Sequence, residues 1–134
     1  MRSTIRIVAL ATAALVAAVA AAPARAAVKE TGVYTKDQAA AGSKEYQAKC
    51  SRCHGANLEG VSAPALRGEA SGLKGDSVGQ ALTFVSTQMP AGDPGSLSTA
   101  EYDDIVAYIL ARNGHPAGAT ALTPASAKKS TAKL

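Results

Sequence analysis

The sequence predicts an all-α domain made of three or more short helices. Apolar residues recur at the three- and four-residue spacing of a helix, and helix-start motifs precede these stretches. No stretch alternates apolar and polar residues for long enough to predict a sheet strand. The 134 residues include one Phe and no Trp, so few large side chains are available for a core. Such a chain favours a small domain that packs around a bound apolar group.

The first predicted helix runs from about residue 36 to about residue 51. Thr35 and Gln38 have the spacing of a capping box, in which side chains satisfy the free backbone N–H groups at a helix start. Gly42 lies inside this helix. Residues 27–34 have no regular pattern, and we expect them to form a short irregular lead.

A second helix is predicted after a glycine-rich loop. Five glycines and Pro64 lie between residues 55 and 75, which favours irregular structure. Ser77 and Gln80 then repeat the capping-box spacing, and apolar residues at helical spacing continue to about residue 87.

The clearest helix follows a loop over residues 89–95 that holds two prolines and two glycines. Ser98 and Glu101 form its predicted start, and Asn113-Gly114 forms a typical stop. Its apolar stripe consists of Tyr102, Ile105, Val106, Ile109 and Leu110.

The folded domain is therefore expected to span residues 35–115. Residues 116–134 are rich in Ala, Ser, Thr, Pro and Lys and offer little material for a core. We expect this tail to be disordered.

The first 26 residues have the pattern of a secretory signal peptide. Two arginines precede an apolar run from Ile7 to about Ala22, and Ala24-Arg25-Ala26 supplies the small residues of a cleavage site. The alternative is a membrane anchor, but the apolar run is shorter than the roughly 20 residues that a membrane span needs. We expect cleavage after residue 26, a periplasmic mature protein and no membrane span in it.

The mature chain is expected to be close to neutral. The full sequence has 14 Lys+Arg and 10 Asp+Glu, but three arginines lie in the signal segment, which leaves 11 against 10. A chain so close to neutral gives no reason to expect nucleic acid as a partner.

Both cysteines of the chain lie in one pentapeptide, Cys50-Ser51-Arg52-Cys53-His54. Residues three and four apart share a helix face, so the two sulfurs can point toward the two vinyl groups of one haem. His54 can then place a ring nitrogen at the iron. This spacing is a known attachment signature for c-type haem.

Three other interpretations of the pentapeptide remain. A Cys-x-x-Cys redox couple would suit an exported protein, although the βαβ context typical of that chemistry is missing. A structural zinc site needs four ligands, and the whole chain has only two cysteines and two histidines. A simple disulfide between Cys50 and Cys53 is the third.

A haem iron also needs a sixth ligand, or an open position that does chemistry. Met89 is the only methionine of the mature chain, and His115 is its only other histidine. Met89 precedes Pro90, which biases it toward extended backbone, and it lies in a stiff loop between two helices. His115 follows the helix stop and is expected to be an exposed tail residue. Met89 is the better candidate.

These motifs make the chain similar to a small class I c-type cytochrome, a single-haem, exported protein with His/Met ligation. The resemblance covers residues 35–114 and includes the attachment motif, Pro64 with its neighbours, Met89-Pro90 and the helix that ends at Tyr108-Ile109-Leu110.

The resemblance implies a cytochrome c-like fold around one covalent haem c. His54 would be the proximal ligand and Met89 the distal one. A carbonyl next to Pro64 would accept the imidazole N–H of His54.

Gly42 and Tyr46 match the pair that crosses the last helix of this family near Tyr108. One departure is the absence of Trp, which some relatives use to bind a haem propionate. Arg67, Lys74 or a tyrosine hydroxyl could replace it.

The implied function is one-electron transfer, not an enzymatic reaction. The donor would be a dehydrogenase or a quinol-oxidising complex and the acceptor an oxidase or a reductase; the sequence identifies neither. Two alternatives stay open: a haem sensor or catalytic haem protein with an open distal site, and a haem-free thiol redox protein.

Overall fold

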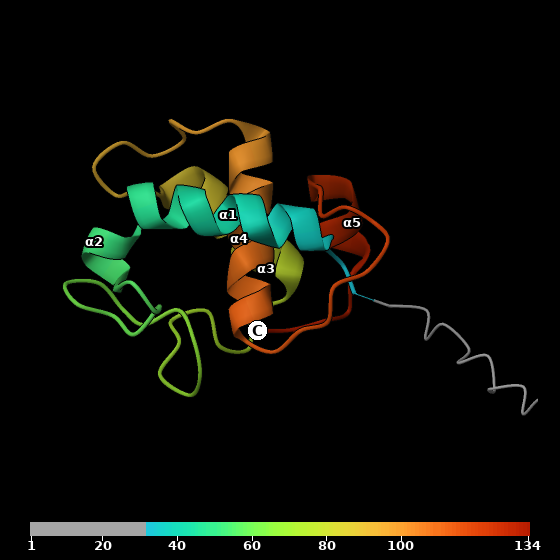
Figure 1. The fold of residues 1–134 in the computed structure, drawn as a ribbon, viewed down its shortest axis with the longest axis horizontal. Coiled ribbons are helices and arrows are strands. Elements are labelled where there is room, and N and C mark those ends of the chain that lie inside the picture. The colour runs from blue at the N-terminus through green and yellow to red at the C-terminus, as the bar shows by residue number, and fades with distance from the viewer. Residues whose placement is uncertain (1–31) are drawn as a thin grey trace, which may run out of the picture.

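The computed structural model describes residues 32–134, which form five helices and no strand (Figure 1). These are α1 (Lys36–Lys49), α2 (Ser51–His54), α3 (Val78–Gln88), α4 (Thr99–Arg112) and α5 (Pro124–Lys129). The predicted all-α fold is confirmed for this part of the chain. The predicted signal peptide, and residues 27–31 of the lead, lie outside the described residues.

The helix starts agree with the sequence motifs. Complete capping boxes form at Thr35, Ser77 and Ser98, where α1, α3 and α4 begin. One boundary differs, because the first predicted helix divides at Cys50 into α1 and the four-residue α2.

Helix α1 crosses α4 at close range (Figure 1). Gly42 lies against the backbone of α4, where an added Cβ atom would overlap the Asp104 carbonyl group and come within 2.8 Å of the Ile105 nitrogen. One turn further on, the Tyr46 and Tyr108 rings lie 5.3 Å apart. The predicted pairing of Gly42 and Tyr46 with the helix that carries Tyr108 is therefore confirmed.

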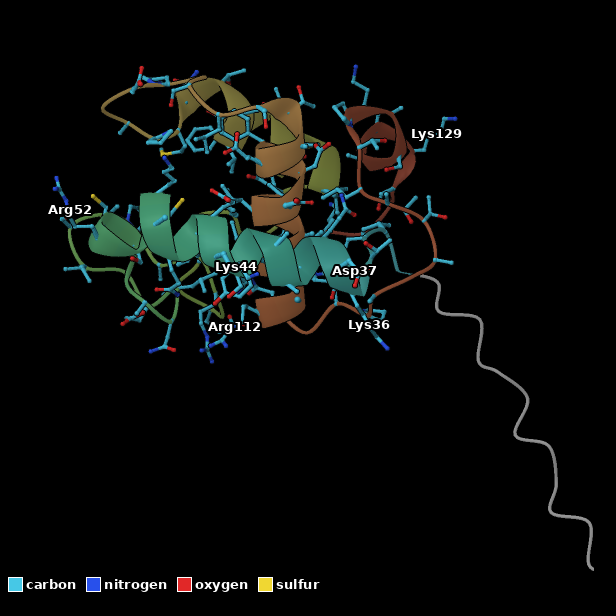
Figure 2. All side chains as sticks on the ribbon, turned by 45° about the horizontal axis from the view of Figure 1, so that its top comes forward. Lys36, Asp37, Lys44, Arg52, Arg112 and Lys129 are labelled. Carbon is cyan, nitrogen blue, oxygen red and sulfur yellow. The ribbon has the colours of Figure 1, made fainter. Side chains whose placement is uncertain are left out.

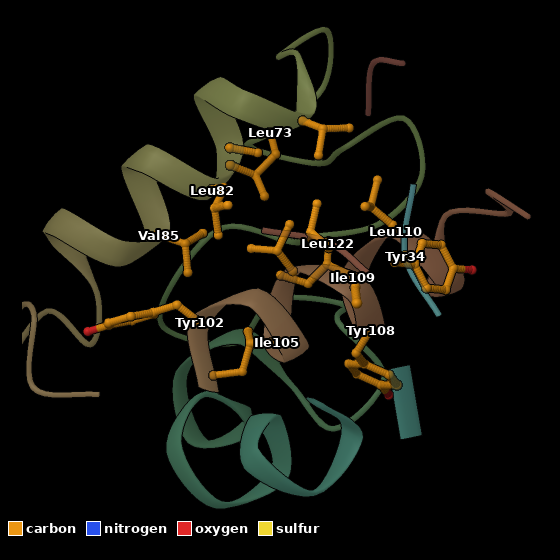
Figure 3. Packing of buried hydrophobic residues seen from close by; sticks show 14 of the residues in the cluster. Tyr34, Leu73, Leu82, Val85, Tyr102, Ile105, Tyr108, Ile109, Leu110 and Leu122 are labelled. Carbon is orange, nitrogen blue, oxygen red and sulfur yellow. The ribbon is translucent and has the colours of Figure 1, made fainter. Parts of the chain in front are cut away.

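The buried core surrounds α4 (Figure 3). Ile105, Ile109 and Leu110 of this helix are at most 1% exposed. Leu82 and Val85 of α3 lie in the same cluster. The core thus consists mainly of medium-sized side chains, as the composition indicates.

The prediction that residues 116–134 are disordered is wrong. Residues 116–134 lie against the domain and include α5, with Leu122 and Ala127 at most 1% exposed. The Gln38 side chain donates to the Leu122 carbonyl and accepts from the Leu122 N–H, at 2.9 and 2.7 Å. The Gly75 N–H donates to the carbonyl of the last residue, Leu134, at 2.6 Å. These two buried side chains and these hydrogen bonds hold the segment on the domain, although its average composition is poor in core residues.

Among residues 32–134 the longest helices, α1 and α4, have 14 residues each, and no helix there is a candidate membrane span.

Asp103 is a buried acid on α4, only 6% exposed, and its Oδ1 atom has no hydrogen-bond partner among the described residues. Burial, with a smaller contribution from the charge of Asp104, raises the pKa of Asp103 to about 6. The fold therefore favours the neutral carboxyl group.

This raised pKa predicts a loss of stability toward neutral pH. The contribution of Asp103 is fully present below its ordinary pKa of 3.8 and is lost as the pH rises through about 6. Asp103→Asn should flatten this part of the profile and raise the free energy of unfolding near neutral pH by about 1–2 kcal/mol. Denaturant unfolding across this pH range measures it, with the exposed Asp93→Asn as control. An unchanged profile in Asp103→Asn would contradict the prediction.

Candidate haem-binding site

One cavity of about 260 Å³ collects all five of the predicted site residues, Cys50, Cys53, His54, Pro64 and Met89. Most of its other lining is apolar and comes from α1, α3, α4 and the loop that follows α2. The further lining residues are Tyr46, Lys49, Ser62, Ala63, Leu66, Leu73, Phe84, Val85, Pro90, Ala91, Ile105 and Ile109.

The attachment pentapeptide forms a single helical turn. The Cys50 N–H donates to the Tyr46 carbonyl at the end of α1, at 2.8 Å. The Cys50 carbonyl then accepts from the N–H groups of Cys53 and His54, at 3.1 and 3.0 Å. This turn aligns the two cysteines along the cavity wall. Arg52, between them, is exposed and points away from the rest of the molecule at the outer end of α2 (Figure 2).

The two thiols are free, with Cys50 half-buried and Cys53 exposed. Burial, and to a lesser degree the charge of Cys53, raises the pKa of Cys50 to about 11. A redox-active thiol pair works through a thiolate, which forms because the pKa of the reactive thiol is lowered. The local electrostatics of Cys50 therefore oppose the thiol redox interpretation.

The loop after α2 folds back onto it and brings Pro64 to His54. The Cys53 carbonyl accepts from the N–H groups of residues 61, 62 and 63 at 3.0–3.1 Å, and the His54 carbonyl accepts from Gly60 at 2.8 Å. Gly55 permits the turn, since its φ of 83° is one that other residues rarely adopt.

The His54 ring is oriented by a hydrogen bond between its Nδ1 atom and the Pro64 carbonyl oxygen, 2.8 Å long. A carbonyl oxygen can only accept, so Nδ1 carries the proton and Nε2 keeps its lone pair for a metal. The acceptor is the carbonyl of Pro64 itself.

Met89 directly follows α3 and has extended backbone, with φ −121° and ψ 153°. Its N–H donates to the Val85 carbonyl at 3.1 Å, and its carbonyl accepts from the Tyr102 hydroxyl at 2.7 Å. The main chain of Met89 is thus held on both sides while its half-buried side chain lines the cavity. The expected extended geometry before Pro90 is present.

His115 takes no part in this cavity. It is half-buried instead of exposed, its N–H donates to the Leu110 carbonyl at 3.1 Å, and its own carbonyl accepts from the Tyr34 hydroxyl at 2.6 Å.

Two of the substitutes expected for the missing Trp also lie outside the cavity. Neither Arg67 nor Lys74 lines the cavity, and Lys74 pairs with Glu69. Tyr46 lines the cavity, but its hydroxyl donates to the Gly55 carbonyl at 2.8 Å. Lys49 is the lysine that does line the cavity. Lys49 was not predicted as a cavity residue from the sequence, although its position directly before Cys50 could have indicated it.

These residues fit a haem. The five predicted residues share an otherwise mainly apolar cavity, one imidazole has a free nitrogen, and two free thiols lie at helical spacing. Within residues 32–134 no three His, Cys, Asp or Glu side chains are grouped to hold a metal ion, so the geometry gives no support to a structural zinc site.

Two comparisons with known proteins report partial matches. The chain is 38% identical over 78 residues to a thiosulfate dehydrogenase from Psychrobacter arcticus, over 51% of this chain and 24% of the relative. It therefore spans about a quarter of that relative's length. Among solved structures, the sulfane dehydrogenase SoxCD from Paracoccus pantotrophus matches 57% of this chain and 43% of its own, with 29% identity and a TM-score of 0.48.

A family model also matches the chain. The model for cytochrome c oxidase, cbb3-type, subunit III covers residues 37–109, which is more than half of the sequence and extends from α1 into α4. This chain therefore belongs to that family of c-type cytochromes, whose cytochrome c domain binds haem and transfers electrons.

Proposed function

We propose that this chain is a periplasmic electron carrier with one haem c attached covalently to Cys50 and Cys53. His54 is the proposed proximal ligand and Met89 the proposed distal ligand. One observation carries the proposal: these four side chains, from two segments far apart in the sequence, line the same apolar cavity.

Bound haem supplies an iron that gains and loses one electron. The chain's own residues set the conditions for that exchange. The Pro64 carbonyl fixes the tautomer and orientation of the His54 ring. The neutral thioether of Met89 favours the reduced state and raises the potential, and the apolar lining limits access of water.

An open distal site, as in a haem sensor or a catalytic haem protein, requires that Met89 does not bind. Both backbone groups of Met89 are hydrogen-bonded to neighbouring helices, which favours a fixed side chain. This observation supports the carrier over the sensor.

The proposed partners are proteins that donate or accept one electron. The likeness to a segment of a thiosulfate dehydrogenase favours a dehydrogenase as the donor. The same likeness fits either a diffusing carrier or an electron-transfer subunit of a larger oxidoreductase. In both roles the chain catalyses no substrate reaction of its own. Nucleic acid is not among the proposed partners.

Met89→Ala tests the proposed ligation. Loss of the thioether should lower the reduction potential and remove the weak absorption band near the red end of the ferric spectrum. It should also let carbon monoxide bind the ferrous protein readily. Redox titration and optical spectroscopy measure these changes.

His115→Ala is the matched control, because it removes the other candidate ligand, which lies outside the cavity. It should leave both potential and spectrum unchanged. If Met89→Ala matches the wild type, and the wild type already binds carbon monoxide tightly, the open-site function replaces the carrier.

A further inference from the structure

The Tyr102 hydroxyl joins both ends of the loop that contains Met89. It donates to the Met89 carbonyl at 2.7 Å and accepts from the Leu97 N–H at 3.3 Å. One side-chain oxygen on α4 therefore holds the first and the last residue of the segment 89–97.

Tyr102 is itself firmly placed. It lies in the first turns of α4, its N–H donates to the Ser98 carbonyl at 3.1 Å, and it is 4% exposed. The side chain extends from α4 below Val85, with its hydroxyl directed away from the buried cluster (Figure 3). A buried ring with two χ angles has little freedom, so the hydroxyl is a rigid anchor.

The rest of the loop has few such anchors. Between residues 89 and 97 the main chain makes two short-range turns, from Asp93 to Pro90 at 2.9 Å and from Ser96 to Asp93 at 3.4 Å. The Gly95 N–H reaches the Met89 carbonyl at 3.4 Å, a weaker bond than that of Tyr102. Most of residues 91–96 are exposed. The Tyr102 hydroxyl is therefore the shortest link between the Met89 carbonyl and the helical core.

We propose that Tyr102 is a positioning residue for Met89, and that its hydroxyl holds the loop in the position from which the thioether reaches the haem iron. This inference rests on the proposed function, since it assumes that Met89 is the distal ligand. Tyr102 does not line the haem cavity and acts only through the Met89 main chain.

Tyr102→Phe holoprotein tests the inference, because it keeps the buried ring and removes both hydrogen bonds. The half-buried Met89 carbonyl would keep only the weaker bond from the Gly95 N–H, and the loss of one such hydrogen bond shifts an equilibrium by up to roughly tenfold. We expect the carbon monoxide affinity of the ferrous protein to rise by about that factor. The reduction potential should fall part of the way toward that of Met89→Ala, and the ferric red band should weaken.

Tyr34→Phe is the matched control. The Tyr34 hydroxyl also donates to a backbone carbonyl, that of His115 at 2.6 Å, and the residue is 3% exposed. It lies outside the haem cavity, so this variant should lose stability without a change in potential, red band or carbon monoxide affinity.

The outcomes distinguish ligation by Met89 from positioning by Tyr102. If Met89→Ala changes the spectrum as expected but Tyr102→Phe matches the wild type, the positioning role is overturned and the ligation stands. If the two tyrosine variants lower stability equally and neither alters the haem spectrum, Tyr102 is only a structural residue. If Met89→Ala itself has no effect, the proposed function has failed and this inference with it.

Discussion

A chain in which Cys50 and Cys53 are both alanine should accumulate no haem-bearing protein and should show no cooperative unfolding transition. The cavity walls include Leu66, Val85 and Ile109, which lie within or at the edge of the core cluster. Without a bound haem the apolar cavity that these side chains line would be unfilled, and a domain of this size has little stability in reserve. Haem staining of the denatured protein and far-UV circular dichroism measure the two effects.

Arg52→Ala is the control for this pair, because Arg52 lies between the two cysteines and is exposed. It should yield holoprotein at the wild-type level. If the double alanine variant keeps haem through denaturation, attachment does not depend on these thiols and the site assignment is wrong.

Gly42→Ala should cost at least about 3 kcal/mol of unfolding free energy, which is large for the addition of one methyl group. The new Cβ atom would overlap the Asp104 carbonyl group, and neither helix backbone can yield without separating α1 from α4. The gain in helix propensity of about 1 kcal/mol is too small to compensate. Denaturant unfolding of the holoprotein measures the loss.

Gly92→Ala is the same change at a place where an added Cβ atom would have no neighbour within 4 Å. Its unfolding midpoint should stay close to that of the wild type. Equal midpoints for Gly42→Ala and the wild type would mean that the two helices do not meet as described.

Local motifs predicted the framework of this fold well. Capping boxes depend on residues three positions apart, so Thr35, Ser77 and Ser98 could be identified as helix starts from the sequence alone. The crossing at Gly42 could be predicted from the family resemblance because only glycine allows so close an approach of two helix backbones.

Features that depend on residues far apart in the sequence were harder to predict. Gln38 helps to hold the tail through hydrogen bonds to Leu122, which lies 84 residues further along the chain. The amino-acid composition of the tail does not indicate this pairing. Tyr102 was predicted as part of an apolar stripe, and only the fold reveals that its hydroxyl reaches Met89. Lys49, the last residue of α1, lines the cavity, and only the fold reveals this position.

The optical spectrum of wild-type protein matured in the periplasm is the decisive measurement of haem binding and ligation by Met89, because it reports on the cofactor and its axial ligands together. We expect a c-type haem spectrum with a weak ferric band near the red end, and a ferrous spectrum that carbon monoxide barely alters. A haem spectrum without that band, and with a large shift on adding carbon monoxide, would contradict ligation by Met89. The absence of any haem spectrum would contradict the proposed function as a whole.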